Sequence, residues 1–388
     1  MTVQIKEREA ILNKLIESAK RIGQIAEAET VEADKNSTVS KNVINAIKEE
    51  QIHRLIIPKE YGYPQIDFLT FNEFIKKVGY YNLSAAWLAY FFALHNAWAA
   101  LLPKNRMDEI YNDGGLLADI FAPVGEVTRG DGGYYLNGKW NFVSGVNYST
   151  WISLGAFYRE DGAPPKRLGL CMRVEELTIV KDWDSLGLRG SGSNTVIADN
   201  VFVPDDMVFD FAEVINNRKP IPLEVDEDYL YYNTAFFPAF YLGFASMSLG
   251  AAERVINEYR ERTKQRIRYD GTNESMEPKS QRVLADLTLK LKSAQGLMKE
   301  YIEMLETDNG QYLLGEYKGL RAQIIQNCID IAVKVQLALG AYALKKGNVI
   351  ETMVRDLLAI GGHITSLYDD GIDSYGKALF GLPDKTTG

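Results

Sequence analysis

The sequence predicts a mainly α protein with a central β-domain. Three observations support this fold class. Apolar residues recur every three or four positions in residues 1–114 and again in residues 216–388, which is typical of amphipathic helices. Between them, residues 115–215 hold short runs of β-branched and aromatic residues separated by Gly, Asn, Asp and Pro, which favour strands and turns. We therefore expect three domains in this order: an N-terminal helical domain, a β-domain and a C-terminal bundle.

Four helices are predicted in the first domain. The apolar spacing indicates an amphipathic helix over residues 11–25, and Ser40 is a candidate N-cap for a second helix over residues 40–56. A third helix is expected over residues 68–78. The segment 83–103 is apolar on nearly every face and ends in a proline, which predicts a central buried helix.

The β-domain is predicted from six short runs, among them "LLADIFAP", "YYLNGKWNFVSG" and "TVIADNVFVP". Asn137-Gly138 is the strongest hairpin signal among them, because both residues tolerate the backbone of a tight turn. The sequence therefore predicts a compact β-domain with a turn at this dipeptide.

The last domain is predicted to be an antiparallel four-helix bundle. Two helices are expected over residues 238–268 and 316–346. Between them, a helix of similar length, near thirty residues, is expected to carry the apolar positions of 283–298, and a fourth begins near Ile350. Short polar turns join them, and Gly347 is a candidate stop signal for the third. Long helices of similar length with short connections are typical of such bundles.

Composition and missing motifs exclude several function classes. The formal net charge of −9 argues against a nucleic-acid binder, and no apolar run is long enough for a membrane span. Two distant cysteines and a charged N-terminus without a signal-peptide core favour a cytoplasmic protein. The chain has three histidines and no HExxH, GxxxxGK[ST], GxSxG or GxGxxG motif. We therefore expect no metal site and no nicotinamide site of the Rossmann type.

Four motifs in chain order resemble a known family. They are "PKEYGY" at 58–63, "GKWNFVSG" at 138–145, "LGLRGSGSN" with "VFVP" at 186–204, and "RDLLAIGGHI" followed by "YG" at 355–376. Together with the domain order, they make the chain similar to the acyl-CoA dehydrogenase fold superfamily. Within it, the chain resembles the two-component monooxygenases, such as the hydroxyphenylacetate hydroxylase oxygenase components and the dibenzothiophene monooxygenases. The resemblance implies a small β-barrel or sandwich between the two helical domains.

The resemblance also implies a reaction. Such an enzyme takes reduced flavin, FMN or FAD, from a separate flavin reductase and forms the C4a-hydroperoxyflavin with O₂. It then transfers one oxygen atom to a small apolar substrate, which we expect to be aromatic. The missing nicotinamide motif agrees with a separate reductase, and the expected assembly is a homo-oligomer, most simply a tetramer.

The flavin would lie against the "FVSG" strand and the Gly/Ser loop. A flat isoalloxazine ring needs small hydrogen-bonding groups along its edge and apolar cover on its faces. By the family match, Ser144 would bond near N5, Val143 would lie beside the ring, and Trp140 or Phe142 would cover a ring face. A loop carrying Ser191 and Ser193 would close the substrate side. Without the resemblance, the loop is equally a β-turn and the aromatic residues are equally β-domain core.

Two histidines are candidate catalytic residues. The resemblance places His363, expected in the last bundle helix, near flavin C4a as a cation or proton donor, and it places His95 near the substrate. The alternative for each is a buried histidine bonded to a backbone carbonyl. His53 is expected to be a solvated surface residue.

Arg262 and Arg266 are the candidate phosphate ligands. They are four residues apart, so a helix would place them on one face, where they could clamp a phosphate. The resemblance implies flavin phosphate, often that of a neighbouring subunit. The alternative is that these arginines complement the negative end of the helix dipole.

Two other functions remain open at the level of sequence. A dehydrogenase of the same fold, or a relative of nitroalkane oxidase, would need a carboxylate base, for which Asp369 and Asp370 are the candidates. A flavin-binding or scaffold protein without turnover is the other possibility.

Overall fold

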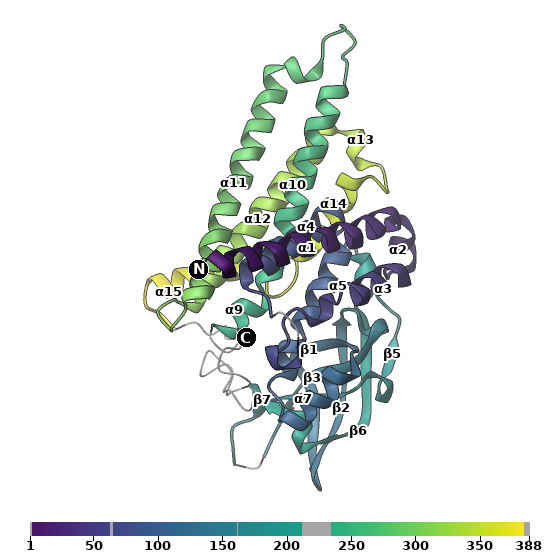
Figure 1. Cartoon of the computed structure of the whole chain (residues 1–388), viewed down its shortest axis with the longest axis vertical. Coiled ribbons are helices and arrows are strands. Elements are labelled where there is room, and N and C mark those ends of the chain that lie inside the picture. The colour runs from purple at the N-terminus through teal and green to yellow at the C-terminus, as the bar shows by residue number, and fades with distance from the viewer. Residues whose placement is uncertain (1, 63–64, 161, 212–233, 384–388) are drawn as a thin grey trace.

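The computed structural model describes residues 2–62, 65–160, 162–211 and 234–383. Figure 1 shows three regions: helices from the first part of the chain, a sheet below them, and long helices that extend above them. This order and arrangement confirm the predicted fold class.

The N-terminal region is helical as predicted. Its helices are α1 (Thr2–Ala28), α2 (Thr30–Asn36), α3 (Lys41–Glu49), α4 (Phe68–Tyr81), α5 (Leu83–Leu94), α6 (Asn96–Ala99) and α7 (Lys104–Asp113). The side chain of Ser40 accepts hydrogen bonds from the backbone N–H groups of Asn42 and Val43, which confirms its role as an N-cap.

Two of the predicted helices are shorter than expected. The helix that follows Ser40 ends at Glu49, because Gln51 adopts a left-handed backbone (φ 55°) that leads into a 3-10 turn. That turn faces inward, so His53 is buried and its expected surface position is wrong. The predicted helix over 83–103 is interrupted at His95. There the Asn96 amide donates to the carbonyls of Phe92 and Ala93 and so competes with the helical hydrogen bonds.

The strands form one seven-stranded mixed sheet. They are β1 (Leu116–Gly130), β2 (Gly133–Val143), β3 (Ser149–Tyr158), β4 (Lys166–Arg173), β5 (Thr178–Val180), β6 (Asn194–Pro204) and β7 (Val208–Asp210). The order is β5-β6-β2-β1-β3-β4-β7, with β1 and β3 parallel and the other neighbours antiparallel.

The hairpin predicted at Asn137-Gly138 is wrong. These residues lie inside β2, and the chain turns instead at Asp131-Gly132, where Gly132 has φ 71°. The side chain of Asn137 accepts a hydrogen bond from the backbone of Asn200, beside a shift in the β2–β6 register. The dipeptide therefore marks a bulge rather than a turn.

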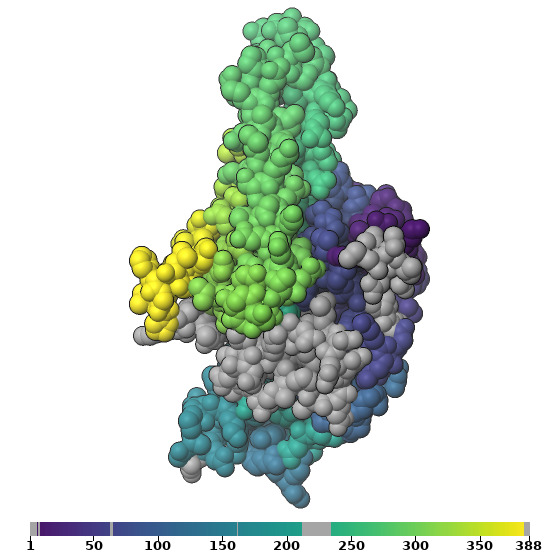
Figure 2. All heavy atoms as spheres, turned by 60° about the vertical axis from the view of Figure 1, so that its left-hand side comes forward, coloured from purple at the N-terminus to yellow at the C-terminus, as the bar shows by residue number. Residues whose placement is uncertain are grey.

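The C-terminal region contains long helices. Its elements are α9 (Phe236–Phe240), α10 (Leu242–Gln265), α11 (Pro278–Thr307), α12 (Leu314–Leu339), α13 (Ala341–Leu344), α14 (Val349–Gly361) and α15 (Tyr368–Leu379). Figure 2 shows that α11 and the end of α10 project beyond the rest of the molecule.

Three helices of this region begin, end or break at residues that the sequence did not predict. The first begins after a break at Tyr241 and ends at Gln265, and the third ends at Leu339 because Gly340 has φ 62°. The fourth is divided into α14 and α15, so His363 lies in the turn between them and not in a helix as expected.

Helix α5 connects the three regions. It packs against α4 and α10 and contacts both β1 and α14, and all twelve of its residues are buried. A residue on α5 can therefore face the sheet and the bundle at once.

In the described residues, no helix combines the length and apolar character that a membrane span requires. Within the same residues, no group of three or more histidine, cysteine and acidic side chains is placed to hold a metal ion.

Candidate active site

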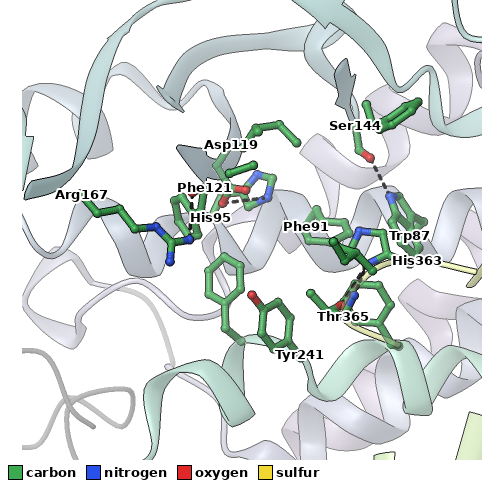
Figure 3. Close-up of a pocket in the computed structure, with 16 residues that line it drawn as sticks. Trp87, Phe91, His95, Asp119, Phe121, Ser144, Arg167, Tyr241, His363 and Thr365 are labelled. Carbon is green, nitrogen blue, oxygen red and sulfur yellow. Dashed lines mark hydrogen bonds and ion pairs between the residues drawn. The ribbon is translucent and has the colours of Figure 1, made fainter. Parts of the chain in front are cut away.

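A cavity of about 300 Å³ lies where the three regions meet. Its walls come from α5, from strands β1, β2 and β4, from the start of the bundle and from the turn after α14. Figure 3 shows Ser144, Trp87, His363 and Thr365 at one side of this cavity and Asp119, His95 and Arg167 at the other, with Phe91 between them. We call these the serine end and the carboxyl end. Tyr241 lies below the carboxyl end and is counted with it.

One face of α5 forms the floor between the two ends. Trp87, Phe91 and His95 follow at intervals of four residues, so they lie on one side of the helix. The ring of Phe91 contacts the other two, with centroids 5.0 Å from each. This helix therefore fixes the distance between the serine end and the carboxyl end.

Ser144 is the last member of a chain of three hydroxyl groups at the serine end. The indole N–H of Trp87 donates to Ser144 Oγ at 2.8 Å. Ser193 Oγ lies 2.8 Å from Ser144 Oγ, and Ser191 Oγ lies 2.7 Å from Ser193 Oγ. Two segments that are distant in the sequence, "FVSG" and "RGSGSN", thus meet at Ser144.

The backbone beside Ser144 has an unusual conformation. Phe142 has φ 70° at a register shift in β2, and its side chain is 66% exposed at the rim of the cavity. Gly145 also has a positive φ of 71°, and a Cβ there would lie 2.7 Å from the ring of Phe92. This bulge turns Ser144 toward the cavity, as bulges near active sites often do.

His363 is held as a neutral donor. The backbone N–H of Thr365 donates to His363 Nδ1 at 3.3 Å, and the Thr365 hydroxyl lies 2.9 Å from the same nitrogen. With Nδ1 accepting, the ring proton lies on Nε2. Burial and the nearby Arg321 guanidinium lower the pKa of His363 to about 4. The geometry therefore favours a neutral N–H donor over the cation that we considered from the sequence.

The carboxyl end carries several titratable groups. His95 Nδ1 lies 2.6 Å from the carbonyl oxygen of Leu117, and His95 Nε2 lies 3.3 Å from Asp119 Oδ2. Burial raises the pKa of Asp119 well above its ordinary value and lowers that of His95 to about 4. Arg167 donates to the carbonyl of Phe121 at 3.0 Å, and burial lowers its pKa. Burial also raises the pKa of Tyr241 to about 12.

The structure brings some of the predicted site residues to the cavity and leaves others away from its wall. Phe142, Ser144, His95 and His363 line it. Ser191 and Ser193 are buried behind Ser144 and reach the cavity only through its hydroxyl. Trp140 and Val143 point into the interior of the sheet, so their expected places beside a flavin ring are corrected. The ring of Trp140 fits there because Gly125 and Gly138 leave room for it.

Arg262 and Arg266 line a second cavity, of about 570 Å³, at the projecting end of the bundle. Only Arg262 is helical, because α10 ends at Gln265. The Arg262 guanidinium lies over the ring of Tyr342 at 4.3 Å, and Arg266 Nε is 3.8 Å from Glu274. The two cavities share no lining residue.

The two candidate carboxylate bases do not reach the first cavity. Asp369 and Asp370 are exposed on the first turn of α15. Neither lines the cavity, and this position removes the structural basis for the dehydrogenase alternative.

Sequence reasoning missed Trp87, Asp119, Arg167 and Tyr241. The signal for Trp87 was its spacing of eight residues from His95 on a predicted helix. The signal for Asp119 was a single charged residue in the apolar run "LLADIFAP". Arg167 and Tyr241 carry no comparable local signal, because only the tertiary fold brings them to the cavity.

Comparisons with known proteins agree with this architecture. Residues 242–366 match the family "Acyl-CoA dehydrogenase, C-terminal domain". The chain is 26% identical to the oxygenase component of p-hydroxyphenylacetate 3-hydroxylase of Acinetobacter baumannii, over 97% of this chain and 90% of that protein. It is 26% identical to HsaA of Rhodococcus jostii, the oxygenase subunit of a flavin-dependent monooxygenase, over 88% of this chain and 91% of that protein.

A solved structure extends the likeness to the fold of the whole chain. XiaF from a Streptomyces species, solved with FADH2 and glycerol, superposes with a TM-score of 0.91 at 22% identity. The match covers 100% of this chain and 99% of that one.

Proposed function

We propose that this chain, which has the acyl-CoA dehydrogenase fold and resembles oxygenase components along nearly its whole length, is itself the oxygenase component of a two-component flavin-dependent monooxygenase. It takes reduced flavin, FMN or FAD, from a separate reductase. It then uses O₂ to oxygenate a small aromatic substrate. A cytoplasmic location stays a prediction.

The serine end fits a flavin ring. It combines an uncharged hydroxyl and a neutral imidazole with apolar side chains at the rim, where Phe142 is 66% and Ile364 is 78% exposed. Exposed apolar side chains around a few polar groups are typical of a site that awaits a flat aromatic ligand. When bound there, reduced flavin supplies the activation of O₂.

Ser144 is suited to donate one hydrogen bond into the cavity. A hydroxyl has one proton and two lone pairs. If Ser191 donates to Ser193 and Ser193 to Ser144, both lone pairs of Ser144 are filled, because Trp87 already donates to one of them. The Ser144 proton then points at the ligand. The contacts of Ser144 with Trp87 and Ser193 are the observation on which the proposed function chiefly rests.

His363 is suited to stabilise negative charge that develops beside the ring. Its Nε2–H donates while Thr365 fixes the ring orientation, and no proton has to leave the imidazole. The aromatic side chains of Trp87, Phe91 and Phe244 exclude water from the space between the two ends.

The second cavity is proposed to bind the flavin phosphate of a neighbouring copy of the chain. Arg262 and Arg266 supply charge for a phosphate, while the first cavity lies in another part of the molecule. Leu337 and Leu344 near the second cavity are 75% and 61% exposed, as expected for a surface that a second copy covers. We therefore propose a homotetramer, which sedimentation at micromolar concentration tests.

An anaerobic binding experiment tests the cofactor assignment. The uncharged serine end and its apolar rim should hold reduced flavin more tightly than oxidised flavin. The measurement is a fluorescence or calorimetric titration of the flavin-free protein with both redox states of FMN and of FAD. Equal affinity for the two states would contradict the proposal.

A further inference from the structure

Asp119 is a carboxyl group in an unusual place. It lies in β1, between β2 and β3 in the interior of the sheet, and its side chain is only 10% exposed. Its neighbours in "LLADIFAP" are apolar, and it lines the first cavity. A buried carboxyl is unfavourable unless it has a partner, so its presence calls for a functional explanation.

His95 is the one polar side chain within ion-pair distance of Asp119 in the described parts of the chain. A carbonyl oxygen only accepts hydrogen bonds, so the contact with Leu117 fixes a proton on His95 Nδ1. The other ring nitrogen, Nε2, faces Asp119 Oδ2 at 3.3 Å. Neither atom has a hydrogen-bond partner among the described residues. The pair can therefore share one proton, which lies on the carboxyl or on the imidazole.

The buried surroundings of the pair favour its neutral form. Burial raises the pKa of Asp119 and lowers that of His95, which places the shared proton on the carboxyl. The other titratable or charged groups near Asp119 are Arg167 and Cys171 on β4 and Tyr241 after α9. Burial raises the pKa values of the Cys171 thiol and the Tyr241 hydroxyl, so both stay protonated. Arg167 is then the cation that lines the carboxyl end, and a second cation, the Arg321 guanidinium, lies 5.1 Å from the centre of the Tyr241 ring.

We propose that Asp119 is a catalytic residue that relays a proton from a substrate hydroxyl to His95, and that the substrate is a phenol. This inference rests on the proposed function. The phenolic O–H lies at the free oxygen of Asp119, with the aromatic ring extending along Phe91 toward the serine end.

The relay conserves protons and charge. The substrate O–H bond breaks, its proton binds the free oxygen of Asp119, and the Oδ2–H proton of Asp119 passes to His95 Nε2. The bonding electrons remain on the substrate oxygen, which becomes a phenolate, and His95 becomes an imidazolium, whose pKa rises from its low value because the new anion lies close by. Arg167 stabilises the new anion. A phenolate ring is richer in electrons than a phenol ring, so it accepts an electrophilic oxygen atom more readily.

A titration without flavin tests the relay. The probe is 4-nitrophenol, whose anion absorbs visible light, and the protein is the flavin-free wild type, Asp119→Asn or Asp369→Asn. Asp369 is exposed outside the cavity, so it provides a matched control for the same substitution. We expect the wild type and Asp369→Asn to lower the pKa of bound 4-nitrophenol, and Asp119→Asn to raise it by at least one unit relative to them, a tenfold change in ionisation. Equal values for the wild type and Asp119→Asn, or no binding of the probe, would overturn the proposal.

Turnover separates this proposal from the proposed function. With reduced flavin and O₂, Asp119→Asn should hydroxylate phenols about 100-fold more slowly than the wild type, the usual size of a general acid–base contribution. More acidic fluorinated phenols should recover part of this loss, which a purely structural role of Asp119 would not produce. A thioether substrate has no acidic proton, so Asp119→Asn should lose at least tenfold less of the wild-type turnover rate with a thioether than with a phenol. Equal losses of rate with the two substrates would overturn the relay. If the wild type oxygenates neither substrate, the proposed function is contradicted. The flavin-free titration with 4-nitrophenol does not depend on turnover, so it would still test the role of Asp119.

Discussion

The two ends of the first cavity carry different kinds of chemical group within one shared space. At the serine end, Ser144, Trp87 and His363 are uncharged and act by fixed hydrogen bonds. At the carboxyl end, Asp119, His95 and Arg167 are titratable or charged.

This difference suggests a division of labour. A group that stabilises charge beside a cofactor works best when it is fixed in place and does not change protonation. A group that accepts a proton from a substrate must have a proton that can move. Helix α5 holds the two sets apart, because its face carries Trp87 at one end and His95 at the other.

Sequence reasoning predicted the fold better than the site. Periodicity and N-caps, such as Ser40, depend on local residues, and these predictions are confirmed. The helix breaks at His95, Tyr241 and Gly340 were missed because side-chain competition and tertiary packing produce them. The hairpin at Asn137-Gly138 was wrong for a related reason, since a bulge and a turn use the same residues.

Within the site, the resemblance indicated Ser144, His95 and His363, and the structure brings these three residues to one cavity. Sequence could not indicate the orientation of Trp140, which points into the sheet, nor the inward position of His53. Asp119 and Arg167 come to the same cavity only in the folded chain. The catalytic and binding roles of these residues stay predictions, as do the three domain boundaries.

The largest effect is expected at His363. His363→Ala removes the neutral donor at the serine end and should slow the reaction of the bound reduced flavin with O₂ roughly 100- to 1,000-fold, as for loss of one preorganised donor. Stopped-flow mixing of the anaerobic complex with O₂ measures this rate. Normal oxygen kinetics combined with lower thermal stability would show that His363 has only a structural role.

A smaller effect is expected at the second cavity. Charge reversal in Arg262→Glu or Arg266→Glu removes a charge-assisted hydrogen bond to phosphate, which is worth roughly 1.5 to 3 kcal/mol, so flavin should bind about 10- to 150-fold more weakly. Lys264→Glu is the matched control, because Lys264 is exposed at the same helix end but does not line the cavity. Unchanged flavin affinity in both arginine variants would contradict the assignment.

Ser144 should control coupling rather than oxygen reactivity. Ser144→Ala removes one neutral hydrogen bond, worth roughly 1 kcal/mol, so hydrogen peroxide should be released about five-fold faster relative to product formation. Peroxide and product are measured together in each turnover, with exposed Ser293→Ala as the control. An unchanged ratio of peroxide to product would mean that Ser144 does not donate to the flavin.

The last effect concerns the stability of the fold and tests how the serine end is anchored. Asp356 on α14 accepts a hydrogen bond from the backbone of Leu188, at the start of the loop that carries Ser191 and Ser193. Burial raises the pKa of Asp356 to about 7, so between pH 4 and pH 7 the folded chain holds a proton that the unfolded chain has lost. This group therefore makes stability decrease as pH rises through that range, by up to about 1.4 kcal/mol per pH unit.

Asp356→Asn keeps an acceptor for Leu188 but cannot ionise. Urea unfolding of both proteins at pH 5 and pH 7.5 should show a smaller loss of stability for the variant across this range. Parallel pH dependence in the two proteins would mean that Asp356 does not titrate there.

The most direct test of the proposed function is a single turnover with ¹⁸O₂. The purified chain is mixed anaerobically with chemically reduced FMN or FAD and a panel of phenols, indoles, thiophenes and amines, and ¹⁸O₂ is then admitted. A monooxygenase with a flavin at the serine end should place one ¹⁸O atom in the product of at least one aromatic substrate, and phenols should react fastest. A product that has lost two hydrogens and carries no ¹⁸O, or the release of all oxygen as peroxide with every substrate, would contradict the account.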